Sequence, residues 1–150
     1  MIRVQREPFS PEAELASFRA GLAGTGAVAS FAGYVRGEAG GVETLELDHY
    51  PGVTEKEIAR IEAMAQARFD ITASLVIHRF GKMAPGEPIV LVAAAAAHRK
   101  PALAAVDFLM DYLKTDAPFW KRETGPDGAR WIEPTETDRA ARKDWKDTTS

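Results

Sequence analysis

The sequence predicts an α+β fold. Stretches rich in valine and aromatic residues come in neighbouring pairs joined by Gly/Pro turns, and amphipathic helices separate the pairs instead of alternating with single strands. The length of 150 residues is typical of one domain, and a hydrophobic content of 45% with 27% charged residues is ordinary for a globular protein. We expect a single catalytic domain at residues 1–134, with antiparallel hairpins and about three helices. A polar, loosely held tail should follow at 135–150.

The N-terminal region predicts one strand and one helix. The strand is expected at residues 2–6. Pro11 suits the first helical position, because its fixed φ fits a helix and its missing N–H would have no partner there. Ser10, immediately before it, is a favourable N-cap. The glycines within residues 21–26 should end this helix.

Four further strands are expected to form two hairpins. Residues 27–36 are rich in valine and aromatic side chains, and residues 43–50 alternate apolar and polar ones, so we expect these two to pair. Residues 71–80 and 88–97 should form the second hairpin across the turn GKMAPGE. A third, shorter pair is expected within residues 118–133, around the turn Gly-Pro-Asp-Gly.

Two more helices complete the expected fold. Thr54 and Glu57 have the spacing of a capping box and predict the start of one. Pro101 is expected to open the other, whose apolar stripe leaves Lys114 on a polar face near the C-terminal end.

Composition excludes several kinds of protein. The net charge of −3 argues against broad nucleic-acid binding. The absence of cysteine excludes disulfides, thiolate metal sites and a cysteine nucleophile. The longest apolar run, residues 89–97, is too short to span a membrane, and the N-terminus lacks the apolar stretch of a signal peptide, so we expect a cytoplasmic protein. The three histidines lack metal-ligand spacing, and we expect neither a metal nor a cofactor.

Three basic residues stand at the ends of expected strands and helices. His98 and Arg99 lie between an apolar strand and a helix N-terminus, where unpaired N–H groups favour an anion such as phosphate. They also fit a solvated connection in which His98 bonds to the backbone. Arg36 ends a strand before the glycine-rich segment 37–41, so it is either an anion clamp or an edge residue paired with Glu38. Position alone leaves these alternatives open.

Two lysines could lie close together at one end of the fold. Lys114 is three residues from Asp111 on the same helical face, so a surface ion pair is the simplest interpretation. Lys121 and Arg122 follow after a short strand-forming segment. Crowded cations lower each other's pKa, and a neutral lysine is a base or nucleophile whereas a charged one stabilises negative charge. The spacing does not decide between these roles.

Five blocks of the sequence, in order, resemble the MoaE family, the catalytic large subunits of molybdopterin synthase. Long strings in a consistent order are far more specific than one short motif. The blocks are FAGYVRG (31–37), LDHYPGVTEKEI (47–58), VIHRFGKMAPGE (76–87), AHRKPA (97–102) and MDYLKTDAPFWKRE (110–123).

The resemblance implies an α/β hammerhead fold and a homodimer, with a small ubiquitin-like sulfur-carrier subunit at each end to make a heterotetramer. It implies a sulfurtransferase of molybdenum cofactor biosynthesis. The C-terminal Gly-Gly thiocarboxylate of the small subunit would supply sulfur to cyclic pyranopterin monophosphate, giving the dithiolene of molybdopterin. A chain without cysteine fits such a reaction, because the partner carries the sulfur.

The resemblance also implies the residues of the site. Lys114 would be the principal acid–base or charge-stabilising residue, with Lys121 assisting, and Tyr34 would contribute its backbone. The implied substrate-binding residues are Tyr34, Val35, Arg36, His98, Arg99, Lys114, Lys121, Arg122 and Glu123. The alternative is a non-catalytic module that binds a phosphorylated ligand or serves as a scaffold for a partner.

Overall fold

The computed structural model describes residues 1–37, 44–117, 119–125, 128–132 and 136–147, which form eight strands and four helices. This confirms the α+β class, with one helix more than the sequence predicted. The elements are β1 (Ile2–Gln5), α1 (Pro11–Ala20), β2 (Ala27–Tyr34), β3 (Thr44–His49), α2 (Val53–Arg68), β4 (Ala73–Arg79), β5 (Gly81–Met83), β6 (Pro88–Ala96), α3 (Arg99–Thr115), β7 (Phe119–Gly125), β8 (Gly128–Ile132) and α4 (Glu136–Asp147).

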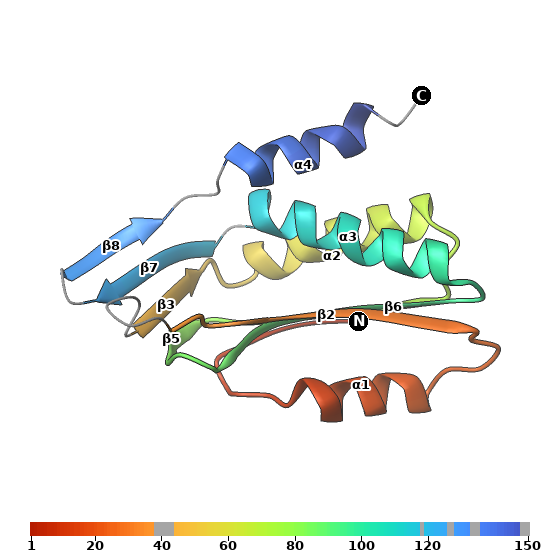
Figure 1. Ribbon diagram of the computed structural model, residues 1–150, viewed down its shortest axis with the longest axis horizontal. Coiled ribbons are helices and arrows are strands. Elements are labelled where there is room, and N and C mark those ends of the chain that lie inside the picture. The colour runs from red at the N-terminus through yellow and green to blue at the C-terminus, as the bar shows by residue number, and fades with distance from the viewer. Residues whose placement is uncertain (38–43, 118, 126–127, 133–135, 148–150) are drawn as a thin grey trace.

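The larger sheet has the strand order β1-β4-β6-β2, with β1 parallel to β4 and the other pairs antiparallel. Helices α2 and α3 cover one face and α1 the other (Figure 1). The central strand β6 is therefore apolar on both faces: Val92 packs toward α2 and α3, and Leu91 packs toward α1. This two-sided burial explains the continuous apolar run at this point of the sequence.

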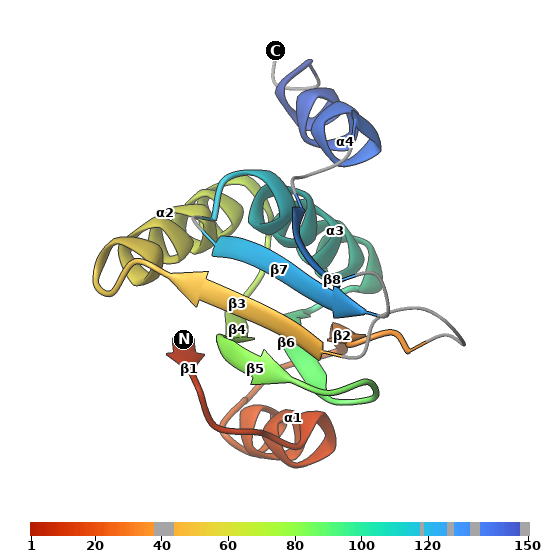
Figure 2. The same cartoon turned by 90° about the vertical axis from the view of Figure 1, so that its left-hand side faces the viewer.

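The smaller sheet has the order β5-β3-β7-β8 and is antiparallel throughout. Figure 2 shows it crossing one end of the larger sheet. Three of its residues form a small buried cluster with Val35, which follows β2; we call this the end cluster: Val35, Leu45, Leu47 and Met83. Phe119 packs against both this cluster and the main core under α2 and α3, so it joins the two sheets.

The expected hairpin of residues 27–36 with 43–50 is wrong. Strand β2 pairs with β6, and β3 pairs with β5 and β7. The physical reason is burial, because Leu45 and Leu47 of β3 reach the end cluster only from within the smaller sheet. The second expected hairpin is confirmed, since β4 and β6 are antiparallel partners, and so is the β7–β8 pair.

The helix starts agree in part with the prediction. Ser10 caps α1 by accepting a hydrogen bond from the Ala13 N–H at 3.2 Å. Helix α2 starts earlier than the predicted capping box, with Gly52 as N-cap, and the Gly52 N–H donates to Glu55 Oε2 at 2.6 Å. Thr54 lies buried inside the first turn, where its Oγ1 accepts from the Tyr50 N–H. Of the helices in the described residues, none is long and apolar enough to cross a membrane.

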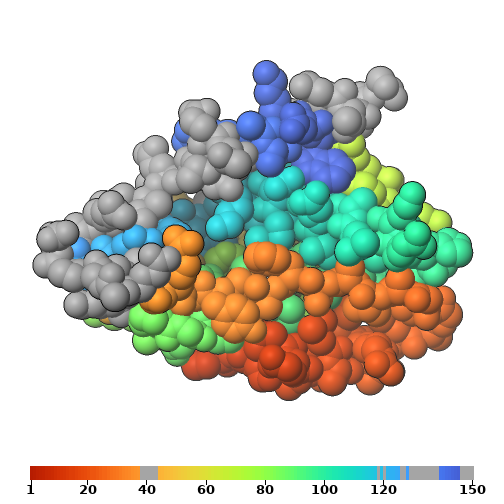
Figure 3. All heavy atoms as spheres, viewed as in Figure 1, coloured from red at the N-terminus to blue at the C-terminus, as the bar shows by residue number. Residues whose placement is uncertain are grey.

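The prediction of a loosely held tail is wrong for residues 136–147. They form α4, which lies on α3 (Figures 1 and 3). The Trp145 Nε1–H donates to Asp111 Oδ2 at 2.5 Å, and the Trp145 ring lies edge-on to Phe108. Arg142 pairs with Asp116 at 2.6 Å. One face of a mostly polar helix therefore carries an aromatic anchor and an ion pair, which hold it to the core.

Candidate functional site

The last residue of β2 and the two that follow it are three of the predicted site residues. Val35 is 4% exposed in the end cluster, and it exchanges two backbone hydrogen bonds with the turn before β6. Its N–H donates to the Glu87 carbonyl at 2.9 Å, and its carbonyl accepts from the Gly86 N–H at 2.7 Å. Tyr34 and Arg36, on either side, are exposed. A buried anchor thus holds two residues that face the surface.

Strand β7 divides its three predicted residues between two faces. Lys121 lies opposite Leu47 in the β3–β7 ladder, and Glu123 lies opposite Leu45. Residues directly opposite each other in an antiparallel pair point to the same side of a sheet. Lys121 and Glu123 are therefore on the side of the end cluster, with Lys121 Nζ 4.0 Å from Glu123 Oε1. Arg122 is exposed and points to the other side.

Lys114 lies exposed in the last turn of α3, at the end of the helix that leads into β7. Its charge acts on His78, a half-buried histidine of β4 that stacks on Phe119 with ring centroids 3.9 Å apart. Burial lowers the pKa of His78 to about 4; the backbone bond to Arg79 opposes this shift, and the positive charge of Lys114 adds to it. The neutral imidazole donates from Nδ1 to the Arg79 carbonyl at 2.9 Å. Lys114 thus lies near His78, whose ring stacks on Phe119, the first residue of β7.

His98 and Arg99 lie at the other end of α3. The helix begins at Arg99, two residues before the predicted Pro101, and His98 is the N-cap without a side-chain capping bond. Both side chains are exposed, and the first turn has no acidic residue, so this helix N-terminus suits an anion. At 1.5 Å per residue, the distance along the axis from Arg99 to Lys114 is about 22 Å. Within one chain, the structure does not bring the two groups together (Figure 1).

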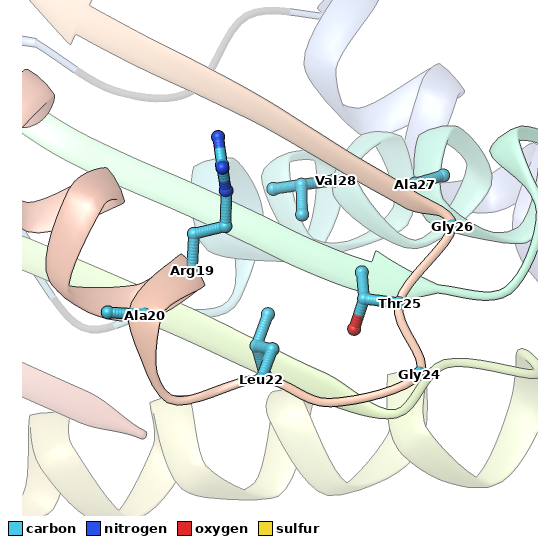
Figure 4. Close-up of a pocket in the computed structure, with 8 residues that line it drawn as sticks. All are labelled: Arg19, Ala20, Leu22, Gly24, Thr25, Gly26, Ala27 and Val28. Carbon is cyan, nitrogen blue, oxygen red and sulfur yellow. The ribbon is translucent and has the colours of Figure 1, made fainter.

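A pocket in a different part of the surface lies where α1 connects to β2 (Figure 4). Its volume is about 580 Å³, and none of the predicted site residues lines it. The lining residues are Arg19, Ala20, Leu22, Gly24, Thr25, Gly26, Ala27 and Val28. Elsewhere, no three acidic or histidine side chains of the described ranges lie close enough together to hold a metal ion. The predicted site residues bring ammonium, guanidinium, imidazole and carboxylate groups.

Two neighbours of the site were not singled out from the sequence. His78 is one of three histidines without metal-ligand spacing, and the turn at residues 84–87 is predicted only as part of a hairpin connection. Both belong to the block VIHRFGKMAPGE, whose length and unusual composition were the available signal. Its contacts with Phe119 and Val35 are between segments far apart in the sequence, so a local pattern could not reveal them.

Comparison with known proteins gives matches over nearly the whole chain. Residues 4–116 match the family model described as MoaE protein. A molybdopterin synthase catalytic subunit from Mesorhizobium japonicum is 52% identical over 147 residues, which cover 97% of this chain and 92% of that relative. The structure of a molybdopterin biosynthesis MoaE protein from Burkholderia ambifaria superimposes with a TM-score of 0.84 at 46% identity, covering 97% of both chains. Molybdopterin synthase from Staphylococcus aureus gives a TM-score of 0.78 at 30% identity, covering 87% of this chain and 95% of that one.

Proposed function

The chain belongs to the MoaE family, and on this basis we propose that it is the catalytic subunit of a molybdopterin synthase and works as a sulfurtransferase. The observation that carries the proposal is the position of Lys114 and Lys121. Lys114 lies near the end of α3 and Lys121 lies on β7, the next element of the chain, whose Phe119 packs against both the main core and the end cluster that contains Val35. The cytoplasmic location expected from the sequence is part of the proposal.

The proposed substrate is cyclic pyranopterin monophosphate. Arg36, His98 and Arg99 would bind its phosphate, because guanidinium groups and a helix N-terminus both stabilise an anion. Lys114 and Lys121 would lie next to the carbons that receive sulfur and stabilise the charge that develops there. The whole chain contains no cysteine, so the sulfur must arrive on another molecule.

We propose that this molecule is a small ubiquitin-like subunit whose C-terminal thiocarboxylate enters the site. The relative from M. japonicum is named a catalytic subunit, which implies at least one further subunit in that enzyme. A thiocarboxylate is an anion, and the ammonium groups of Lys114 and Lys121 would attract it to the end of the fold where they lie.

We further propose that the enzyme is a homodimer, and a heterotetramer once two small subunits are bound. Strand β2 forms one edge of the larger sheet, and its Val28, Phe31 and Tyr34 are 38%, 43% and 47% exposed. In Figure 3 the orange residues of this edge form an open band between α1 and α3. An exposed edge strand with apolar side chains is a template for pairing with another chain.

Pairing of two copies along this edge would also unite the two halves of the site. The first residue of β2 lies opposite Ala96, two residues before His98, whereas its last residue lies two residues before Arg36. If two β2 strands pair antiparallel about a twofold axis, the start of one lies beside the end of the other. His98 and Arg99 of one copy would then approach Arg36 of the second copy.

The test is to mix the purified protein with a thiocarboxylated small subunit and the cyclic pterin phosphate and to measure molybdopterin. Lys114→Ala should lose most of the activity, whereas Lys56→Ala, which removes an exposed lysine on α2, should keep it. Full activity of Lys114→Ala would refute the role assigned to that residue. If the wild-type chain binds the pterin but forms no product, the alternative of a non-catalytic binding module is favoured.

A further inference from the structure

The turn between β5 and β6 is fastened to the segment that carries Arg36. Val35 exchanges two backbone hydrogen bonds with this turn, one with Glu87 at 2.9 Å and one with Gly86 at 2.7 Å. These bonds come after the regular β2–β6 ladder, beyond an irregularity at Gly33 and Tyr34. The residue immediately before Arg36 is therefore held by the turn.

The residue immediately after Arg36 is held by the same turn in a different way. A Cβ atom added to Gly37 would lie 2.5 Å from Cβ of Pro85 and 3.0 Å from its Cγ. Real Cβ atoms do not approach other atoms at 2.5 Å, so any larger residue at this position would push the turn away. Arg36 thus lies between a hydrogen-bonded neighbour and a closely packed one.

A buried arginine holds the turn in place. The Glu87 carboxylate closes the turn by accepting from the Ala84 N–H, and its other oxygen lies 3.7 Å from Arg79 Nη1. Arg79 is 4% exposed, and its Nε and Nη2 donate to the Arg6 carbonyl at 3.1 and 2.9 Å. The Arg79 guanidinium is therefore held by the carbonyl of the residue after β1, and its charge faces the Glu87 carboxylate.

We propose that Arg79 and Glu87 are positioning residues for Arg36, and that they act through the turn at residues 84–87. This inference rests on the proposed function, in which Arg36 binds the substrate phosphate. A binding side chain must be held close to its productive geometry by surrounding residues, and a long arginine on the exposed surface loses that order when its backbone moves. The turn fixes the backbone on both sides of Arg36, and so it sets the point on the surface from which the side chain reaches an anion.

The experiment is a double-mutant cycle between Gly37→Ala and Arg36→Ala, with inorganic phosphate as the probe in an NMR titration. Each single variant should weaken phosphate binding about tenfold, and the double variant should be no weaker than Arg36→Ala alone, because the two act through one interaction. If Gly37→Ala weakens phosphate binding by the same factor in the wild type and in Arg36→Ala, the two losses are additive and the proposal is overturned. A wild-type chain that does not bind phosphate would overturn it as well.

Two further measurements separate positioning from a general structural effect. Glu87→Gln keeps an oxygen for the Ala84 N–H but removes the charge facing Arg79, and it should raise the KM for the cyclic pterin more than it lowers kcat. Gly21→Ala is the matched control, since its added Cβ would meet only the Phe18 carbonyl at 3.9 Å, and it should bind phosphate normally. Thermal unfolding of each variant shows whether it is folded. If Glu87→Gln does not fold, the Gly37 cycle alone decides.

The phosphate titration requires no sulfur donor, so its outcome is independent of turnover. A coupled cycle in a chain that never forms product would support the positioning role and refute the proposed function. Additive losses in a chain that does form product would refute the positioning role and support the proposed function.

Discussion

Acidification should destabilise this protein through His78, which is half-buried and stacked on Phe119, near Lys114. The folded state lowers the pKa of this histidine from 6.5 to about 4, whereas an unfolded chain keeps the ordinary value. The unfolded state therefore takes up a proton first as the pH falls. The stabilisation from the neutral histidine is complete above pH 6.5 and is lost between that value and about pH 4.

The size of the effect follows from the shift of the pKa. Since one pKa unit corresponds to about 1.4 kcal/mol, a shift from 6.5 to about 4 amounts to about 3 kcal/mol of unfolding free energy. The assay is urea denaturation at a fixed protein concentration at pH 7, 6, 5 and 4, for the wild type and for His78→Gln. The glutamine keeps an N–H donor for the Arg79 carbonyl but does not titrate.

The difference in stability between the two proteins should shrink by about 3 kcal/mol from pH 7 to pH 4. Titration of the carboxylates is common to both and cancels in this difference. His98→Gln, which replaces an exposed histidine at the start of α3, serves as the control and should leave the pH profile unchanged. If wild type and His78→Gln lose stability in parallel, His78 does not carry the acid sensitivity and the reasoning from burial fails.

Three further predictions concern assembly and packing. Arg99→Ala and Lys114→Ala should each be inactive alone. After the two variants are unfolded and refolded together, up to about one quarter of the sites should recover in the synthase assay, because a mixed dimer contains one intact site; no recovery would refute a site shared between two copies of the chain. Phe108→Ala should lower the free energy of unfolding in urea by about 3–5 kcal/mol, since this side chain is 1% exposed in the main core. Trp145→Phe removes the N–H donated to Asp111 and should cost about 1 kcal/mol in the same assay; an unchanged value would show that this bond does not hold α4.

The features that the sequence predicted correctly depend on neighbouring residues. Ser10 and Pro11 mark the start of α1 because a cap and the first turn are local interactions. The β4–β6 pair follows the chain through a short connection, so adjacency in sequence and in space agree. The failure of the β2–β3 hairpin has the opposite cause. Both strands have better partners elsewhere, and a pattern within one segment cannot identify a partner that is distant in the sequence.

The tail shows the limit of an argument from composition. A mostly charged segment was expected to be loosely held, but a single face with Trp145 and Arg142 is enough to attach it to α3. The separation of Arg99 from Lys114 was, in contrast, already implicit in the sequence, because both ends of one helix cannot line a single pocket in the same chain. The resemblance supplied these residues as one set without saying which copy of the chain contributes each.

The two lysines of the proposed site depend on how the smaller sheet is docked. Lys114 is fixed by α3 and so by the main core, whereas Lys121 belongs to a strand of the smaller sheet. Phe119 packs against both the main core and the end cluster. Its ring stacks on His78, whose pKa is lowered by burial. A charged imidazole at this position would repel Lys114 and would need water around it, which the stack excludes. The low pKa of His78 therefore favours the neutral ring that stacks on Phe119, the side chain that packs against both the main core and the end cluster.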